Sequence, residues 1–455
     1  MSSTFSSLST ALSALRYNQT AMDVASGNVA NAGTDGYARR QAIAQATGAP
    51  VTPALWSRWN GAGDGVEAGR IDRMVDPLLD SRARTEHASS SYLDTRATSL
   101  ARFETSIDEP SDTGISAALA SFKQSWHDLA NNPGDGAARG VVLARAEDLR
   151  STIAQQAGAV STEWSDQRTR LGAAVSEVNG LADQMSQLNQ GLRSAHLSGT
   201  DAGTLLDQRD QLMLRMSELT GASFTINDDT SVDVKVAGQT LVSATTTAQL
   251  QVTGAGTLDA AAGNPVSLTL GGSPVTIGNG EIGADVALLD HDLPDYQAKL
   301  DSFVGTLATQ VNAQQTAGND LTGTAGTPLF SGTTATTLTV AFTDPGKVAA
   351  ADPAKGQLDG SNATALANLD LGADGYRALV SGFGVTVSSA QSTSTNQATL
   401  TSQVDAARES VSGINTDEEM ANLVAAQRGY EGAARVLTTL DSMLDTLINH
   451  TGIVG

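Results

Sequence analysis

The stretch TDEEMANLVAAQRGYEGAARVLTTLDSMLDTLINH, from Thr416 to His450, decides the fold because it reads as one long uninterrupted helix. Its apolar or small residues recur at alternating steps of three and four, which is the spacing of one helical face. We expect Thr416 to cap the first turn and Glu419 to complete a capping box. This carboxy-terminal stripe consists of Met420, Leu423, Gln427, Tyr430, Ala434, Leu437, Leu440, Leu444 and Leu447. A stripe so narrow requires a partner.

A similar stripe lies at the other end of the chain, between Ser3 and Asn31, with Gln19 and Ser26 at intervening positions. It consists of Phe5, Leu8, Leu12, Leu15, Met22 and Val29. The heptad-like spacing favours a two-helix coiled coil over a broad core face. The sequence therefore predicts an antiparallel coiled-coil pair of terminal helices that gains lasting order from neighbouring copies. The alternative is that both helices cover an ordinary globular core.

The composition excludes several classes of function. The 455 residues, enough for two or three domains, carry 27 Lys and Arg against 49 Asp and Glu, a formal net charge of −22. This balance argues against binding to nucleic acid and to anionic membrane surfaces, which both require clustered cations. The chain has no cysteine, which rules out disulfides, thiolate metal sites and cysteine nucleophiles.

The amino-terminal segment does not resemble a cleaved secretory signal. No Lys or Arg precedes Arg16, and Met1–Leu15 lacks a continuous apolar core. No stretch reaches the roughly 18 apolar residues of a membrane-spanning helix. If the protein leaves the cell, we expect export by a machine that reads an uncleaved segment.

Helical patterns dominate the middle of the chain. We predict an elongated, discontinuous helical bundle over residues 41–221 and 286–412, with short strands and an irregular stretch at 48–75 that ends in a strand at Ile71. The helix over 137–195 is expected to break near Gly158, and the helix over 375–411 is expected to break near Gly382–Gly384. After the β-rich part, the helical pattern is expected to return at Pro294. The expected helices are Asp76–Glu109, Ile115–Ala130, Ala137–Ala195, Leu205–Leu219, Pro294–Gln315, Asp359–Leu369 and Gly375–Val411.

Residues 222–285 have a different texture, because apolar and polar residues alternate with a period of two and are punctuated by Gly, Asn and Pro. This pattern predicts a smaller, β-rich outer domain. The predicted fold is thus mainly α with a β-rich insertion. Residues 1–40 and 413–455 form a separate terminal coiled-coil domain.

The sequence offers no catalytic, cofactor or metal motif. None of the five histidines has a second histidine three or four positions away, as a helical zinc site requires. A G-x-S-x-G elbow and a Walker loop are both missing, and Gly61, Gly63 and Gly65 do not form a dinucleotide loop. Asp228-Asp229 reads most simply as a hairpin turn. We therefore expect neither enzymatic activity nor a cofactor.

The segment NVANAGTDGYARR, Asn28 to Arg40, resembles the amino-terminal signature of the bacterial flagellar axial proteins, which comprise rod, hook and hook-associated proteins. Asp35 stands where that pattern usually has Pro, yet Asp-Gly is itself a good turn pair. The matching turn residues are Asn28, Asn31, Gly36 and Tyr37. The terminal helix resembles the same family.

A second segment, LLDQRDQLMLRMSELTG from Leu205 to Gly221, resembles the hook-associated members found at the junction of hook and filament. Hook and rod proteins generally lack it. Its characteristic residues are Leu206, Asp207, Arg209 and Asp210. From the residues alone, Arg209 could bridge carboxylates on neighbouring helices, or it could form a surface ion pair worth about 0–1 kcal/mol.

The resemblance implies a structural subunit of the extracellular flagellum that joins hook to filament as a ring of copies. It also implies contacts with the hook protein and with a second hook-associated junction protein. Export by the flagellar type III apparatus without a cleaved signal, and a chaperone on the carboxy-terminal helix, are further implications. The alternatives are a hook or distal rod protein, and an exported adhesin-like module whose β-rich domain binds.

Overall fold

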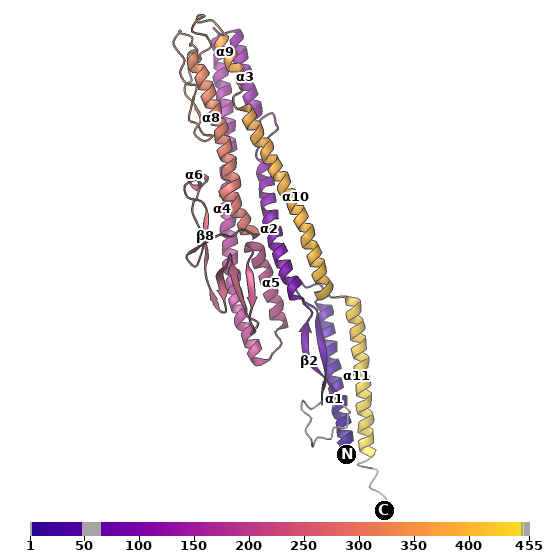
Figure 1. The fold of residues 1–455 in the computed structure, drawn as a ribbon. Coiled ribbons are helices and arrows are strands. Elements are labelled where there is room, and N and C mark those ends of the chain that lie inside the picture. Colours follow the sequence, from indigo (N-terminus) through magenta and orange to yellow (C-terminus); the bar gives the residue numbers. More distant parts are fainter. Residues whose placement is uncertain (1, 48–64, 447–448, 450–455) are drawn as a thin grey trace, which may run out of the picture.

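The computed structural model describes residues 2–47, 65–446 and 449 of the chain. Leu447 and most of the expected irregular stretch lie outside these residues, and the side chain of Phe5 is also not described. The molecule is elongated, with a helical bundle at one end and the two terminal helices side by side at the other (Figure 1). The predicted mainly helical fold with a smaller β part is confirmed.

Long helices form the bundle, and the longest, α4, runs along most of its length (Figure 1). Asp76 caps the first of them through the backbone N–H of Leu78, at 2.8 Å. Gly199 ends α4 in the left-handed conformation, with φ 67°. The helices are α2 (Pro77–Thr105), α3 (Ile115–Asn131), α4 (Gly136–Ser198), α5 (Gly203–Thr220), α8 (Leu293–Ala317), α9 (Ser361–Ala367) and α10 (Ala373–Ser412).

The expected breaks near Gly158 and Gly382–Gly384 are wrong, because α4 and α10 run through them without interruption. Each glycine costs a helix about 1 kcal/mol relative to alanine. Buried residues on both sides outweigh that cost: Ala157 and Val160 flank the first site, and Leu379 and Val387 flank the second. Packing of an apolar face, more than propensity, holds long helices together.

The helical signal returns earlier than predicted, at α7 (Gly280–Ala287) instead of Pro294. Asn279 caps α7, and one turn of π-helix, Leu288–Asp292, connects it to α8. Buried Leu288 and Leu289 hold this turn against the core. Directly after this turn α8 begins at Leu293, with Pro294 in its first turn, where a proline is tolerated.

Two small antiparallel sheets lie along α4 (Figure 1). Asn189 of α4 donates to the carbonyls of Val232 and Ala244, at 2.9 and 2.7 Å, and Asn179 donates to that of Leu250 at 2.9 Å. The strands are β3 (Ser223–Ile226), β4 (Val232–Val236), β5 (Gln239–Ser243) and β6 (Thr246–Thr247) in one sheet, and β7 (Leu250–Thr253), β8 (Ser267–Leu270) and β9 (Ser273–Val275) in the other. Their buried valines and leucines share one continuous hydrophobic core with the bundle.

Minor elements complete the bundle. A short helix, α6 (Leu258–Ala261), follows β7. The strands β10 (Phe330–Ser331) and β11 (Thr339–Val340) pair with each other, and a 3₁₀ turn, Pro345–Lys347, precedes α9.

The chain ends come together at the far end of the molecule. The helices α1 (Ser2–Ala30) and α11 (Thr416–Asp445) lie side by side and run in opposite directions (Figure 1). A hairpin of β1 (Arg40–Thr47) and β2 (Gly65–Arg73) packs against α1, with Arg40 paired to Arg73. We call α1 and α11 the terminal pair.

Candidate assembly site

The two helices of the terminal pair meet through small and polar residues. Ala25 and Ala426 are buried on the facing sides. A Cβ atom added to Gly429 would lie 2.3 Å from Oδ1 of Asn18, so the glycine allows the two helices to come close. The line of contact is therefore made mainly of alanine, glycine and asparagine, and large apolar residues contribute less than the stripes suggest.

The predicted stripes lie at the edges of this contact. On α1, Leu8, Leu15, Met22 and Val29 are half-buried, and Leu12 is 42% exposed. On α11, the half-buried members are Leu423, Ala434, Leu437, Leu440 and Leu444, whereas Gln427, Tyr430 and Met420 are exposed, the last by 49%. The partner helix thus covers each stripe only in part.

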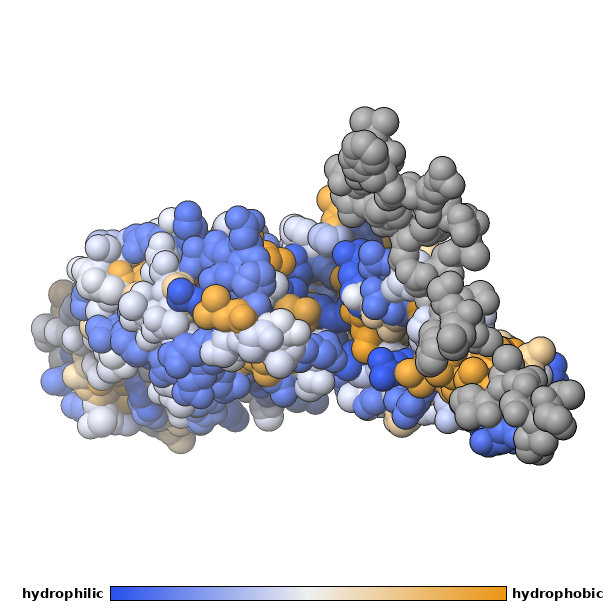
Figure 2. All heavy atoms as spheres, turned by 90° about the horizontal axis from the view of Figure 1, so that it is seen from below, coloured by the Kyte–Doolittle hydropathy of each residue, from blue (hydrophilic) through white to orange (hydrophobic). Residues whose placement is uncertain are grey.

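Further apolar side chains of α11 are open to solvent. Val424, Val436 and Met443 are exposed, Met443 by 56%, and none of them belongs to the predicted stripe. In Figure 2, which views the molecule from the end that carries the termini, apolar surface is visible on the side of the terminal pair. A single-stripe interpretation missed these residues because they lie on other faces of the same helix. A helix with several apolar faces suits more than one neighbour.

A buried ion pair anchors the start of α11. Glu419 is 2% exposed, and its Oε1 accepts a hydrogen bond from Nε of Arg39 at 2.8 Å. Arg39 also reaches Glu418, at 2.8 Å. The expected capping box is wrong: the cap is Asn415, whose side chain accepts from the backbone N–H groups of Asp417 and Glu418. Glu419 is drawn to the arginine instead, because a charged partner is stronger than a backbone donor.

Asn28 connects this ion pair to the turn after α1. Its Nδ2 donates to Oε2 of Glu419 at 2.9 Å and to the carbonyl of Arg40 at 2.8 Å. Its Oδ1 accepts from the backbone N–H of Arg40 at 3.0 Å and from the hydroxyl of Tyr37 at 3.1 Å. This buried amide uses its donors and acceptor fully, which fixes the turn relative to both helices.

The other turn residues hold the chain between α1 and β1. Asn31 donates from Nδ2 to the carbonyl of Gly27, at 2.9 Å, and so closes the end of α1. Gly36 has φ 75°, and a Cβ there would lie 2.2 Å from Nε2 of Gln211 on α5. Glycine is therefore required both by the backbone and by the close approach of α5.

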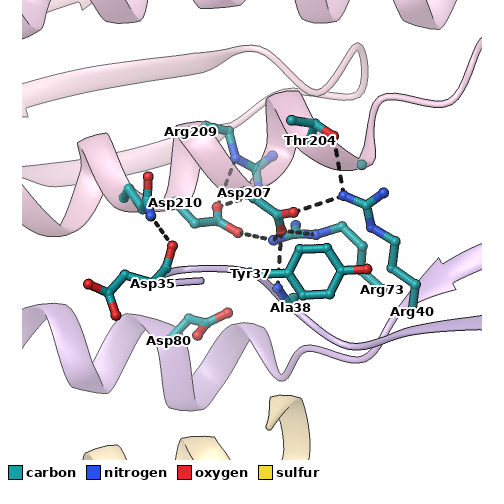
Figure 3. A network of polar contacts seen from close by, with 12 residues as sticks. Asp35, Tyr37, Ala38, Arg40, Arg73, Asp80, Thr204, Asp207, Arg209 and Asp210 are labelled. Carbon is teal, nitrogen blue, oxygen red and sulfur yellow. Dashed lines mark hydrogen bonds and ion pairs between the residues drawn. The ribbon is translucent and has the colours of Figure 1, made fainter. Parts of the chain in front are cut away.

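Two arginines attach the hairpin to α5 (Figure 3). Arg73 donates to Oδ1 of Asp207 at 2.7 Å and to Oδ2 of Asp210 at 2.9 Å. Arg40 donates to Oδ2 of Asp207 at 2.9 Å, and the backbone N–H of Ala38 also points to this carboxylate, at 3.4 Å. Asp207 and Asp210 thus receive the cations that hold the hairpin against the bundle.

Arg209 plays a different role from the one expected. It is buried, and it bonds Asp210 at the next position, at 2.8 Å, without reaching a carboxylate on another helix. Neither the bridge between helices nor the surface ion pair is correct. Leu206 is half-buried on the same helix. The adjacent arginines Arg39 and Arg40 bond carboxylates that lie far away in the sequence, which no local pattern indicates.

A histidine joins three helices beside the hairpin. His87 of α2 lies 3.3 Å from Oε1 of Glu218 on α5 and 3.1 Å from Oδ2 of Asp405 on α10. The hydrogen bond to Glu218 raises the pKa of His87, burial opposes this, and Asp405 adds to it. His87 in turn lowers the pKa of Glu218. Arg408 of α10 also bonds Asp80 of α2, at 2.7 Å.

Within the part of the chain that the structure describes, no group of three or more His, Asp or Glu side chains is arranged to hold a metal ion. No described helix is long and apolar enough to cross a membrane. The charged residues described above connect elements of the fold to one another.

Three family models match the chain. The flagellar hook-associated protein FlgK helical domain matches residues 100–330, about half of the chain. The chain belongs to the FlgK family. The flagella basal body rod protein model matches residues 8–37, and the carboxy-terminal model of the rod FlgEFG proteins matches residues 401–450. The two rod models therefore fall on the terminal pair, and the FlgK model falls on the bundle and its sheets.

Named members of the FlgK family align along nearly their whole length. Flagellar hook-associated protein 1 of Bacillus subtilis is 28% identical over 100% of both chains. That of Salmonella typhimurium is 25% identical over 96% of this chain and 98% of its own. A solved flagellar hook junction protein FlgK from Burkholderia pseudomallei shares the fold, with a TM-score of 0.66 and 16% identity over 73% of this chain and 100% of that one. These FlgK relatives are structural flagellar proteins rather than enzymes.

Proposed function

We propose that this chain joins the hook of a bacterial flagellum to its filament, as a ring of copies that contact one another through the terminal pair. The observation that carries the proposal is the exposed apolar surface of α11, where the described residues leave Met420, Val424, Val436 and Met443 between 41 and 56% exposed. Only Glu419 and Ala426 are buried on the described part of this helix. Neighbouring copies, lying on either side, would cover the rest.

The proposal divides the chain into three parts. Residues 1–40 and 413–455 form the inner assembling part, residues 41–221 and 286–412 form the bundle outside it, and residues 222–285 form the outermost part. The continuous core between the sheets and α4 supports a β part that moves with the bundle as one body. The arginines that bind Asp207 and Asp210 would then transmit the position of the terminal pair to the bundle. The hook protein and a second hook-associated protein would be the neighbours on the two sides of the ring.

The same surface supports a route for export. An α11 with several exposed apolar residues is prone to association before it reaches its place. A chaperone that holds this helix, and a flagellar type III apparatus that reads the amino-terminal segment without cleaving it, would keep the chain soluble until assembly. The mature protein would then lie outside the cell as part of the flagellum.

Surface substitutions on the terminal pair test the proposal. Val436→Ser combined with Met443→Ser removes apolar surface from two side chains that are more than half exposed, so the bundle should fold with a nearly unchanged melting temperature. We expect this double variant to fail to restore filaments to cells that lack the protein. Leu197→Ser, which alters a still more exposed apolar residue at the end of α4, is the control and should restore them.

A truncation gives the stronger version of the test. A chain that ends at Asn415 should keep the bundle folded and soluble, as judged by circular dichroism, but should not assemble. Filament growth supported by this truncation, or by the double variant at wild-type level, would overturn the proposal.

A further inference from the structure

A cleft of about 360 Å³ lies between three helices of the bundle, α2, α4 and α7. Carboxylates line it from every side: Asp94 on α2, Glu177 on α4, and Glu281 with Asp285 on α7. Arg170 of α4 is the one cation among the lining residues. None of the interactions described for the terminal pair or the hairpin uses this cleft.

Asp285 is the unusual member of the set. It is 3% exposed, makes no hydrogen bond or ion pair with any described residue, and has a fully covered Oδ1 without a donor. Burial, and then the charge of Glu281, raise the pKa of this carboxyl to about 7. A buried polar group left without a partner costs about 1–3 kcal/mol. Such a group in a native fold calls for an explanation, and a ligand from outside the chain is one that the open cleft permits.

The surrounding charges leave Asp285 unbalanced. Arg215 of α5 bonds Glu177 at 2.7 Å and Glu281 at 2.6 Å, so those two carboxylates already share a cation. Arg102 of α2 lowers the pKa of Asp285 from a distance, but it bonds Glu163. Arg170 donates to the hydroxyl of Ser99, at 3.4 Å, and forms no ion pair with Asp285. Exposed Asp94 adds a further negative charge without a cationic partner among the described residues.

We propose that this cleft binds one guanidinium or primary ammonium group, with Asp285 as the buried counter-charge and Asp94 as the exposed one. A cation with several N–H donors is the ligand class that unpaired carboxylates recognise. The cleft is much larger than a bare metal ion, and no metal-binding group is formed by the described residues. The group could belong to a Lys or Arg side chain of a second copy, which rests on the proposed function, or to a free small cation.

Calorimetry with methylguanidinium and methylammonium on the full chain tests the site. We expect saturable binding near pH 7, accompanied by the release of protons, because burial raises the pKa of Asp285 and binding of a cation favours its charged form. Titrations in two buffers of different ionisation enthalpy measure that release. Asp285→Asn should abolish both signals. Asp374→Asn, which removes an exposed carboxylate on α10, should change neither.

Two further measurements keep the proposal decidable. Asp94 lies on the exposed side of α2, so Asp94→Asn should leave the fold intact. We expect this variant to bind methylguanidinium about tenfold more weakly. It tests the site even if Asp285→Asn does not fold. The absence of saturable binding by the wild-type chain, or undiminished binding by either variant, would overturn the site.

A polymerisation assay distinguishes the two possible sources of the cation, a side chain of a second copy and a free small cation. If methylguanidinium slows polymerisation of the wild-type chain but not of Asp285→Asn, the natural occupant is a side chain of a second copy. If it binds without slowing polymerisation, the occupant is a free cation. The Val436→Ser and Met443→Ser double variant keeps the cleft, so methylguanidinium should still bind it. A failure of the proposed function and a failure of this site are thereby distinguished.

Discussion

Nε of Arg39 and Oε1 of Glu419 lie 2.8 Å apart, although 380 positions separate the two residues. The bond connects the segment between α1 and β1 to the first turn of α11. Asn28 shares the same carboxylate from the last part of α1. One acidic side chain therefore joins α1, the segment that follows it and the start of α11.

Glu419→Gln should loosen the terminal pair without unfolding the bundle. The substitution removes the buried charge that Arg39 binds and leaves the half-buried guanidinium with Glu418 as its charged partner, at a cost of about 1–3 kcal/mol. Faster amide exchange in α1 and α11, with unchanged exchange in α4, is the expected result. Glu418→Gln is the control, since the Glu418 side chain is 55% exposed and its loss should cost less than about 1 kcal/mol. Equal effects of the two variants would contradict the buried role of Glu419.

Two glycines of α11 make a matched pair for testing the close approach of the terminal helices. Gly429→Val places a branched side chain where a Cβ would already lie 2.3 Å from Asn18, so it should push α1 and α11 apart. Gly432→Ala meets nothing within 4 Å and should stabilise α11 by about 1 kcal/mol through helix propensity. Opposite changes in the protection of α11 against proteolysis would confirm both expectations. Similar changes would show that the helices are not in close contact.

Asp207→Asn should detach the hairpin from α5. Arg40 and Arg73 both bond this carboxylate in a largely buried setting, and removal of one member of such a group costs about 3 kcal/mol. We expect a lower unfolding temperature and faster amide exchange in β1 and β2. Asp201→Asn is the control, because exposed Asp201 lies 4.0 Å from Arg40 and should contribute almost nothing.

His87 should make stability depend on pH in a defined direction. Its folded-state pKa is raised above the ordinary 6.5, so its contribution is complete below that pH and is lost as the pH rises through the folded value. Glu218, whose pKa is lowered from 4.5, contributes above that pH and loses its effect as the pH falls. The free-energy advantage of wild type over His87→Gln should therefore be largest near pH 5–6, at about 1 kcal/mol, and smaller at pH 9.

Urea unfolding of both proteins at several pH values measures this difference. His127→Gln, at an exposed position on α3, is the control and should show no such pH dependence relative to wild type. A stability difference between wild type and His87→Gln that stays constant from pH 5 to pH 9 would mean that His87 does not carry charge between Glu218 and Asp405.

The helices and the period-two β part were predictable because local patterns determine them. Helical spacing located α2, α3, α4 and α11, and the alternation after Gly221 located the strands. The predicted breaks at the glycines were wrong because the prediction used local helix propensity alone. Burial of neighbouring residues, such as Ala157 on α4 and Leu379 on α10, keeps both helices continuous. The start of α7 was missed for a similar reason. The π-turn that connects α7 to α8 is held by buried Leu288 and Leu289, and no local pattern indicates it.

The candidate site was predictable only in its outline. Asn28, Gly36 and Asp207 were found through family resemblance. Their contacts, with Glu419, Gln211 and Arg73 respectively, join positions that no local pattern relates. An acidic triplet at a helix start has an obvious local explanation in capping and the helix dipole. That explanation hid the buried ion pair of Glu419. The pair Arg39–Arg40 was the available clue, because two adjacent cations in a chain poor in cations need acceptors.

The bond from Arg39 to Glu419 also bears on timing. A ribosome makes the donor early and the acceptor only hundreds of residues later. Until then α1 has no α11 to lie against, and Asn28 lacks one of its acceptors. The terminal pair can therefore form only after synthesis of the chain has reached α11. We expect a chain that stops earlier to fold its bundle but to lack the paired helices that the proposed assembly requires.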